Sequence, residues 1–517
     1  MCDSMARQRL EVTMSTGTWI LWGFLALLVA VLVYDLTQKK HAILRSFPII
    51  GHFRYWLEAV GPELRQYIVT DNDEERPFSR DQRRWVYASS KNTNNNFGFG
   101  TDNDLEEAPN YLIIKHKAFP KDDNYGDPLH LIPCAKIVGG PRNRPHAYRP
   151  KSIIYTSAMS YGSLSSAAVE AINRGVAIAQ SQQNTGEGGI SPHHDHGGDL
   201  IYQLGTGYFG ARDRDGNFSM ELLKEKCVRF KVKAVEIKLS QGAKPGRGGL
   251  LPGAKVTKEV AEIRNVEIGR DVASPASHKA FSSADGMLDF VERIAEETGL
   301  PVGIKSAVGE MAFWEDLADL MRDGTRGVDF IQIDGGEGGT GAAPLVFADH
   351  VALPFKIAFS RVYSVFASRG IANKVVWVGS GRIGLPAMGL FSMGLGCDMI
   401  AVAREAMLAI GCIQAQRCHS GHCPTGVATQ NKWLMRGLDP EVKSHRLANY
   451  LVHLRKELMW LTHACGYDHP SEVSLDDFEI IDGCFGAKPA RGLFGYAPGW
   501  GVPDEATLAE ARLLMPH

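Results

Sequence analysis

The sequence has no strongly basic block, and its charges nearly cancel. The 517 residues carry a formal net charge of −2, and 22% of them are charged. Nucleic acid is therefore not an expected partner, because such proteins concentrate lysine and arginine on one surface. Cysteine is scarce outside one loop, and the other cysteines follow no framework pattern. This scatter argues against a disulfide scaffold and favours a reducing compartment.

Apolar runs long enough to cross a membrane are lacking too, with one exception near the N-terminus. Residues 17–34 contain no charged side chain, and Trp19, Trp22 and Tyr34 lie near the ends of the run. Its length is close to the minimum for a membrane-spanning helix, and aromatic residues favour the membrane interface. We predict a single transmembrane helix. A cleaved signal peptide is the alternative, although its apolar core is normally shorter.

Glycine is abundant. The chain has 55 glycines among 517 residues, which exceeds the usual proportion of about 7%. From residue 151 onward, short β-branched runs such as DLIYQL, AVEIKLS and VVWVG alternate with helical stretches such as MLDFVERIAEET. Such alternation indicates parallel strands joined by crossover helices. We predict an α/β fold, a TIM (β/α)8 barrel with helical extensions, in which function belongs to the loops after the strands.

The predicted organisation has four parts. Residues 1–45 form a tail and the transmembrane helix, and residues 46–150 form an N-terminal extension of unassigned role. Residues 151–430 form the barrel. Residues 431–517 form a long helix, expected over Pro440–Gly466, followed by a loose tail over 467–517.

Three cysteines crowd into one Gly-containing loop after the last predicted strand. Residues 412–430 read CIQAQRCHSGHCPTGVATQ, with Cys412, Cys418 and Cys423 close enough in sequence to converge on one inorganic centre. From the spacing alone, an iron–sulfur cluster, a zinc site that borrows His419 or His422, and unrelated free thiols all stay open.

This run resembles the cluster loop of the FMN-containing synthase domain of the glutamate synthase family, down to the CP-GVATQ pattern. The resemblance spans roughly residues 80–480 and is strongest from 155 to 430. It implies that Cys412, Cys418 and Cys423 hold a 3Fe–4S cluster. It covers neither the glutaminase domain nor the glycine-rich C-terminal domain of the large synthases.

Two glycine-rich segments follow predicted strands and can approach a phosphate. They are GSGRIG at 379–384 and DGGEGGTGAAP at 334–344. Barrels bind phosphate with the loops after strands seven and eight, although tight turns alone also explain such glycines. A dinucleotide site is disfavoured, because the acid at Asp398 stands before a strand rather than after one.

The resemblance supplies the remaining site residues. Residues 157–165 resemble the family's first flavin loop, 184–189 the loop with a glutamate near the substrate, and 238–253 the 2-oxoglutarate segment. The catalytic and substrate residues implied are Glu187, Lys238, Gln241, Lys244 and Arg264. The FMN residues implied are Ser157, Ala158, Met159, Ser160, Lys305, Asp334, Gly335, Gly336, Gly339, Thr340, Gly341, Gly379, Gly381 and Arg382.

The expected function is reductive amination of 2-oxoglutarate by ammonia or a small amine, through FMN and the cluster. A ferredoxin or a reductase subunit would donate the electrons. Arg247 and Leu250 stand where the family commonly has Glu and Gln, which puts the substrate in doubt. The alternatives are an N-alkylglutamate synthase, a membrane-tethered electron relay and a scaffold without redox chemistry.

Localisation and assembly follow less directly. Basic residues flank both ends of the apolar run, so they orient it weakly. We place the catalytic part in the cytoplasm because flavins and clusters are inserted there, and the sequence leaves a homo-oligomer open. The histidines of SPHHDHGG, at 191–198, suggest a metal site, but adjacent side chains in extended chain point in opposite directions.

Overall fold

The protein is described here from a computed structural model that covers residues 16–96, 98–122 and 126–515. It divides into two compact units, residues 1–80 and 81–517. This border lies inside the segment 46–150 that the sequence suggests as one extension. The four-part organisation therefore stays a prediction, and the two units are treated separately below.

The first unit is helical. It contains α1 (Thr16–Thr37), α2 (Ala42–Ser46), α3 (Gly51–Leu64) and a π-helical turn at Arg65–Val69. By length and composition, α1 is apolar enough to cross a membrane, and most of its side chains are exposed. The prediction of a long apolar helix is confirmed, and its insertion into a membrane stays a prediction.

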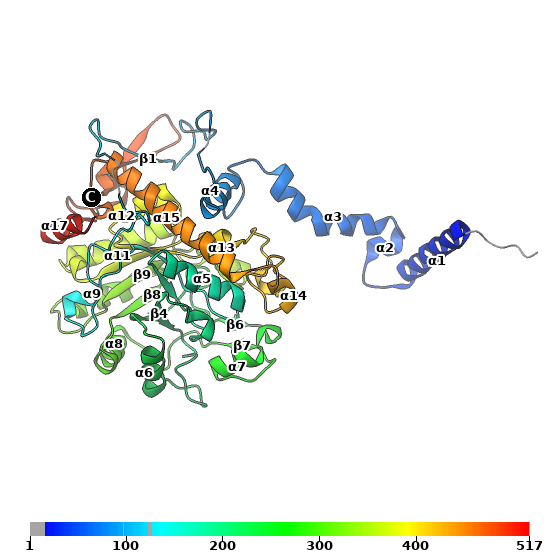
Figure 1. Ribbon diagram of the computed structural model, residues 1–517, viewed down its shortest axis with the longest axis horizontal. Coiled ribbons are helices and arrows are strands. Elements are labelled where there is room, and N and C mark those ends of the chain that lie inside the picture. The colour runs from blue at the N-terminus through cyan, green and yellow to red at the C-terminus, as the bar shows by residue number, and fades with distance from the viewer. Residues whose placement is uncertain (1–15, 97, 123–125, 516–517) are drawn as a thin grey trace, which may run out of the picture. The chain divides into compact units, whose positions relative to one another are not determined.

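The second unit is built on a closed barrel of eight parallel strands, which confirms the predicted TIM-like fold (Figure 1). Around the barrel the strands follow chain order: β2 (Ile154–Thr156), β3 (Gln182–Asn184), β4 (Asp199–Leu204), β5 (Ala234–Lys238), β8 (Val302–Ser306), β9 (Phe330–Asp334), β10 (Val376–Ser380) and β11 (Met399–Val402). Seven of them coincide with the apolar runs of the sequence. Every residue of β5 except Lys238 is buried, as expected for a strand with helices outside and side chains inside.

Strand β3 is the one that hydrophobicity misses, since its sequence is Gln-Gln-Asn. These amides are buried and hydrogen-bonded rather than exposed. Asn173 Nδ2 on α5 donates to Gln183 Oε1 over 2.9 Å, and Asn184 Nδ2 donates to Glu236 Oε1 over 2.8 Å. A polar strand is stable inside a barrel only because its side chains are satisfied there.

Helices cover the barrel and fill the connections between strands (Figure 1). The outer elements are α5 (Ser166–Ile178), α6 (Met220–Arg229), α7 (Lys258–Arg264), α8 (Ala284–Thr298), α9 (Ala312–Leu320), α10 (Leu345–His350), α11 (Phe355–Ser368), α12 (Pro386–Gly394) and α13 (Arg404–Ile410). Ser165 caps α5 by accepting from Ala168 N over 3.1 Å. A small hairpin of β6 (Leu250–Leu251) and β7 (Val272–Ala273) is inserted after β5.

The C-terminal part contains the expected long helix, α15 (Pro440–Ala464), preceded by α14 (Lys432–Met435). Helix α15 packs mainly against α5. The prediction of a loose tail over 467–517 is wrong. There β12 (Phe478–Ile481) pairs with β13 (Ala487–Pro489) and with β1 (Leu112–Ile114).

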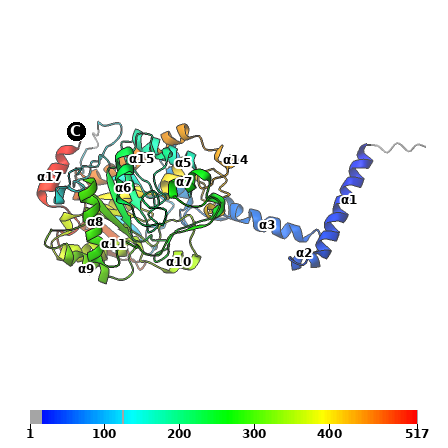
Figure 2. The same cartoon turned by 90° about the horizontal axis from the view of Figure 1, so that it is seen from below.

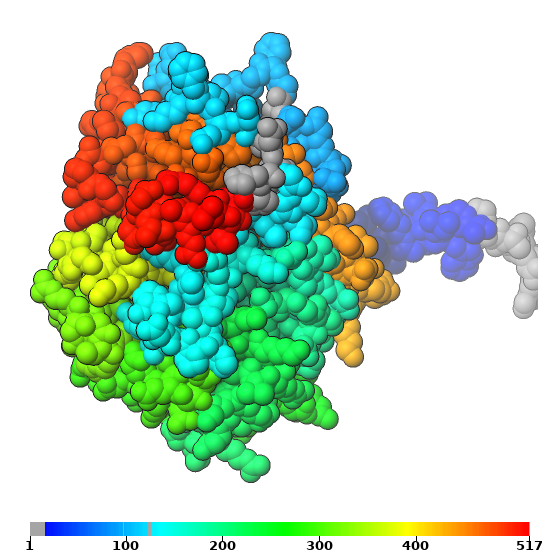
Figure 3. Space-filling model, turned by 60° about the vertical axis from the view of Figure 1, so that its left-hand side comes forward, coloured from blue at the N-terminus to red at the C-terminus, as the bar shows by residue number. Residues whose placement is uncertain are grey.

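The final helices α16 (Ala490–Phe494) and α17 (Glu505–Leu514) also pack on this unit. Buried Tyr496 stacks on Tyr363, and its hydroxyl donates to Leu395 O over 2.8 Å. Figure 3 shows α17 in red against the cyan extension, where Arg149 pairs with Glu510 over 2.7 Å. In the extension, α4 (Arg80–Ser90) spans the border of the two units. Several glycines of this tail, such as Gly483, Gly495 and Gly499, form turns between packed elements.

Candidate active site at the carboxyl end of the barrel

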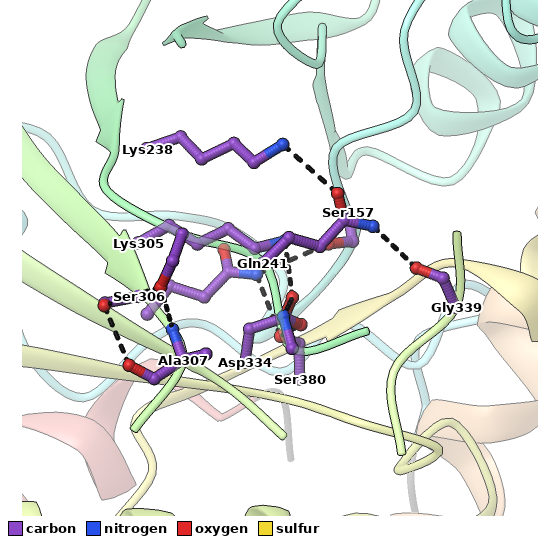
Figure 4. Close-up of polar contacts among 12 residues, drawn as sticks. Ser157, Lys238, Gln241, Lys305, Ser306, Ala307, Asp334, Gly339 and Ser380 are labelled. Atoms are coloured by element: carbon purple, nitrogen blue, oxygen red, sulfur yellow. Dashed lines mark hydrogen bonds and ion pairs between the residues drawn. The ribbon is translucent and has the colours of Figure 1, made fainter. Parts of the chain in front are cut away.

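The loops that follow four barrel strands share one network of polar side chains (Figure 4). Gln332 Nε2 on β9 donates to Ser157 Oγ over 3.3 Å and to Ser380 Oγ over 3.1 Å. Ser380 in turn donates to Asp334, and Lys305 Nζ on β8 lies 3.6 Å from Asp334 Oδ2. The network therefore brings together Ser157, Lys305 and Asp334, which the resemblance assigns to FMN, with Gln332 and Ser380, which the sequence did not suggest.

The loop after β5 closes on the loop after β9. Gly242 N donates to Asp334 Oδ2 over 2.8 Å, and Gln241 Nε2 donates to Gly339 O over 2.7 Å. A β-carbon at Gly242 would lie 1.8 Å from Gly335 O, so only glycine allows this approach. The predicted substrate segment and the predicted cofactor loop are thus in direct contact.

The other predicted cofactor residues lie in the same loops. Gly381 and Arg382 both have positive φ, 137° and 56°, which forms the tight turn after β10. A β-carbon at Gly186 would lie 2.5 Å from Ser160 N, so the loops after β2 and β3 also touch. Thr340 donates to Ala342 O over 3.3 Å, and the remaining members lie in these loops or at the strand end before them, namely Ala158, Met159, Gly336, Gly341 and Gly379.

A buried group of charges lies next to this network. Glu187 Oε1, from the loop after β3, is 3.0 Å from Lys238 Nζ at the end of β5. Lys238 also donates to Gln241 Oε1 over 3.2 Å, and Lys244 and Arg264 act electrostatically on Glu187. Three cations therefore surround one carboxylate, which leaves an excess of two positive charges.

Burial and charge set the pKa values of this group. Burial alone would raise the pKa of Glu187, but the charges of Lys238 and Lys244 outweigh it and lower the pKa to about 2. Burial, assisted by Lys238, lowers the pKa of Lys244. Burial lowers the pKa of Arg264 to about 10, against the effect of Glu187. At neutral pH Glu187 and Arg264 are therefore both ionised.

Arg264 has donors to spare. Its Nη2 donates to Tyr161 O over 2.8 Å, and its guanidinium lies 5.1 Å from the centre of the Phe209 ring. Within the described part of the chain, its buried Nε has no hydrogen-bond partner. A β-carbon at Gly188 would lie 2.8 Å from Nη2, so the backbone leaves the arginine this space. An unpaired buried donor of this kind is suited to a carboxylate ligand.

The β6–β7 hairpin covers the charge group. A β-carbon at Gly249 would lie 2.8 Å from Glu187 Oε1, so the hairpin backbone rests on this carboxylate. The two departures from the family pattern flank this glycine. Arg247 stacks over Phe347 on α10, 5.6 Å from the ring centre, and Leu250 is 53% exposed. Arg247 and Leu250, where the chain departs from the family pattern, therefore lie in the segment that covers the charge group.

Three further residues of the site carry no local sequence signal. Glu236 is fully buried, accepts from Gln203 Nε2 over 2.6 Å, and has a pKa raised by burial. His278 Nε2 lies 2.9 Å from Lys238 O. Arg404, at the start of α13, donates to Glu337 O, and burial lowers its pKa. Only the closed barrel brings these positions to the mouth, so spacing along the chain could not reveal them.

The cysteine loop follows β11 and α13 and lies against other loops of the mouth. Lys255 Nζ, two residues beyond the predicted 2-oxoglutarate segment, donates to Cys418 O over 2.7 Å. Gln430 Nε2 donates to Leu164 O over 2.7 Å, in the loop after β2. Tyr87 donates to Cys412 O over 2.8 Å. The loop is thus fixed between the chain just beyond the substrate segment, the first flavin loop and α4.

The three thiols differ in acidity. Burial raises the pKa of Cys412 to about 12, and burial followed by the charge of Cys423 raises that of Cys418. For Cys423, burial is outweighed by backbone N–H groups, first that of Ala428, which lower the pKa. Backbone donors that stabilise a thiolate are the usual surroundings of a cluster ligand.

The described residues form no site for a single metal ion. Among the described residues, no three His, Cys, Asp or Glu side chains are placed to hold one metal ion. In the SPHHDHGG segment, His193 Nε2 pairs with Glu259 over 3.0 Å, whereas buried His194 accepts from Ser191 N over 3.1 Å. These two histidines have different partners. The segment is a 3-10 helical turn at Pro192–His194 rather than the extended chain assumed from the sequence.

Comparison with known proteins identifies the family. Residues 138–468 match the family description "Conserved region in glutamate synthase". The chain belongs to the glutamate synthase family. It is 39% identical to the Bacillus subtilis glutamate synthase large subunit-like protein YerD, over 86% of this chain and 90% of that one.

Other relatives in the glutamate synthase family match a smaller share of this chain. The archaeal glutamate synthase [NADPH] of Methanocaldococcus jannaschii is 36% identical over 60% of this chain and 59% of its own length. A glutamate synthase large subunit-like protein of Rhizobium meliloti is 30% identical over 66% and 77%. Among solved structures, a mandelate oxidase covers 69% of this chain and 84% of its own at 13% identity, with a TM-score of 0.41. That structural likeness is too distant to bear on function.

Proposed function

We propose that this protein is a glutamate synthase-like oxidoreductase that reduces the imine of 2-oxoglutarate. The carbonyl condenses with ammonia or a small amine with loss of water. Hydride and proton addition to the imine then give glutamate or an N-alkylglutamate. The observation that carries the proposal is the buried excess of two positive charges around Glu187, which matches a dicarboxylate.

The chain's own residues divide the work. Lys244 and Arg264 would bind the two carboxylates, the arginine through its unpaired donors. Glu187, with a pKa of about 2, cannot donate a proton at neutral pH. The hydrogen-bond donor of the pair is Lys238, which Glu187 and Gln241 hold in place.

FMN would supply the hydride, and the residues at the mouth fit it. Glycine loops after β9 and β10 offer backbone N–H groups to a phosphate, and buried Lys305 offers a positive charge to an electron-rich ring. The other residues that would hold it are Ser157, Ser160, Asp334 and Gly339 with their neighbours in the same loops. The hydrogen-bonded contacts among these loops support a preformed cofactor site.

A 3Fe–4S cluster would be held by Cys412, Cys418 and Cys423 and would pass single electrons to the flavin. The donor set supports it: the three thiols act electrostatically on one another, and Cys423 is already stabilised as a thiolate by backbone N–H groups. A ferredoxin or a reductase subunit would bring the electrons. We place the barrel in the cytoplasm, with α1 as a single-pass membrane anchor.

Two measurements test the proposal. Anaerobically purified protein should contain flavin and three irons per chain, a number taken from the cluster type. The reduced flavin should then be reoxidised by 2-oxoglutarate with ammonia, and next with methylamine. Lys244→Met should abolish this reoxidation, whereas the exposed Lys258→Met should not.

An electron relay is the second candidate, and the apolar helix α1 favours it, because a quinone or a membrane reductase would then be near. A protein that contains flavin and iron, but shows no reoxidation with either amine, would favour the relay. A protein without flavin and iron would contradict both functions.

A further inference from the structure

Helix α3 carries an apolar stripe that the described residues of its own unit leave partly exposed. The stripe consists of Phe53, Trp56, Leu57, Val60 and Leu64, which share one side of the helix because they are mostly three or four residues apart, and Ile68 continues it in the π-helical turn. Phe53 is 60% exposed, Trp56 57% and Ile68 74%. Apolar side chains in such a row on a soluble surface indicate a binding surface.

The side of α3 next to the stripe is charged. Arg54 and Glu58 lie there one turn apart and pair over 2.9 Å, and Arg65 follows in the π-helical turn. Exposed Lys39 and Lys40 stand between α1 and α2. A helix with one apolar and one charged side, next to exposed lysines, is suited to an anionic lipid surface.

A specific contact joins the start of α3 to the end of α1. Asp35, in the last turn of α1, has no exposed surface; it accepts from Ile49 N over 2.8 Å, and His52 Nε2 lies 2.8 Å from its other oxygen. Tyr34 and Asp35 mark the polar end of the apolar helix, which is where a membrane span meets its interface. The contact therefore sets the beginning of α3 at the depth of that interface.

An open apolar groove lies between α2 and α3 (Figure 2 shows both helices). It has a volume of about 530 Å³. Its walls are mainly apolar, from Ile43, Phe47, Ile50, Phe53 and Leu57, and the paired Arg54 and Glu58 also line it. The groove continues the stripe toward α1. Apolar walls that face outward at the expected depth of the acyl chains provide a second observation for lipid rather than water.

We propose that α3 lies in the interface of an anionic bilayer, with its stripe among the acyl chains and its charged side toward water. The proposal rests on the proposed membrane crossing of α1 and is independent of the chemistry at the barrel. The protein would then contact the membrane through a span and through an interfacial helix, and the Asp35 contact would fix the turn between them.

The test uses Trp56 as the depth probe in the full-length protein, reconstituted into phosphatidylcholine–phosphatidylglycerol vesicles. The difference in tryptophan emission between wild type and Trp56→Phe reports this residue alone. We expect lipids brominated near the headgroup to quench the difference signal strongly, and lipids brominated near the chain ends to quench it less. Trp433→Phe provides the control, because Trp433 is 69% exposed on the other unit.

Two paired variants separate lipid contact from general damage. Leu57→Glu with Leu64→Glu places charges in the stripe and should abolish most of the quenching. Glu58→Gln with Glu63→Gln removes charges elsewhere on α3 and should preserve it. The proposal is overturned if Trp56 in vesicle-bound wild type is quenched no more than Trp433, or if both paired variants behave alike. A wild type that does not enter vesicles at all would instead contradict the membrane crossing of α1.

Discussion

Replacing Glu187 by glutamine gives a direct measure of the charge balance in the candidate site. The difference between its pKa of about 2 and the ordinary 4.5 corresponds to about 3 kcal/mol of stabilisation of the folded state. Because the folded-state pKa is depressed, this stabilisation is complete above pH 4.5 and declines as the pH falls toward 2. Glu187→Gln should therefore lower the free energy of unfolding of the ligand-free protein by about 3 kcal/mol at pH 7.

The same substitution should strengthen the binding of 2-oxoglutarate. Without Glu187, the three cations present one more net positive charge to a dianion. At the effective dielectric of about 20 that suits protein sites, one added charge at roughly 6–10 Å is worth about 1.5–3 kcal/mol. The Kd should fall by about ten- to a hundredfold. Turnover should fall as well, because Lys238 loses the carboxylate that positions it.

Urea unfolding at pH 7 and at pH 4, and calorimetric titration with 2-oxoglutarate, measure both effects. Glu259→Gln provides the control, since Glu259 is a half-exposed carboxylate that pairs with His193 rather than with the cation group. Weaker binding of 2-oxoglutarate by Glu187→Gln than by wild type would refute the charge argument. So would a variant as stable as wild type at pH 7.

Three further outcomes follow from individual contacts. Lys136→Met should cost about 3–5 kcal/mol in urea unfolding, because it leaves Asp398 buried without its partner at 3.0 Å, and adding Asp398→Asn should recover most of the loss. Gly242→Ala should abolish FMN retention, measured by flavin absorbance, while circular dichroism shows an intact barrel, since the new methyl group would collide with Gly335 O. Cys423→Ser should lower the iron content severalfold and leave bound flavin unchanged; equal loss of both would contradict separate sites.

The sequence predicted the barrel because seven strands are short apolar runs, and periodicity reports burial of that kind. It could not predict the packing of residues 467–517. Their glycines and prolines look like linker, and the strand β12 gains its partner β1 from more than 350 residues away. Nor could it predict that Asp35 would be buried next to His52, because that contact needs the turn at α2.

At the candidate site, sequence motifs identified the loops but not the balance of charge among their side chains. Lys238, Gln241 and Lys244 stand in one recognisable segment. Arg404 and Glu236 have no motif, and their nearness to Asp334 arises from closure of the barrel. Local patterns therefore report which loops carry chemistry, whereas the charges that set pKa values come from neighbours distant in sequence.

The position of Glu187 depends on β3, the strand that the hydrophobicity pattern missed. Strand β3 ends three residues before Glu187 and anchors the loop that carries it. Glu187 can therefore contact Lys238 at the end of β5. That strand is stable only through its amides: Asn173 satisfies Gln183, and Asn184 satisfies Glu236. A strand of apolar residues could pack equally well, but it would remove the hydrogen bond that Asn184 donates to Glu236. The polarity that hid β3 from a hydrophobicity pattern therefore supports the charge balance on which the proposed dicarboxylate site depends.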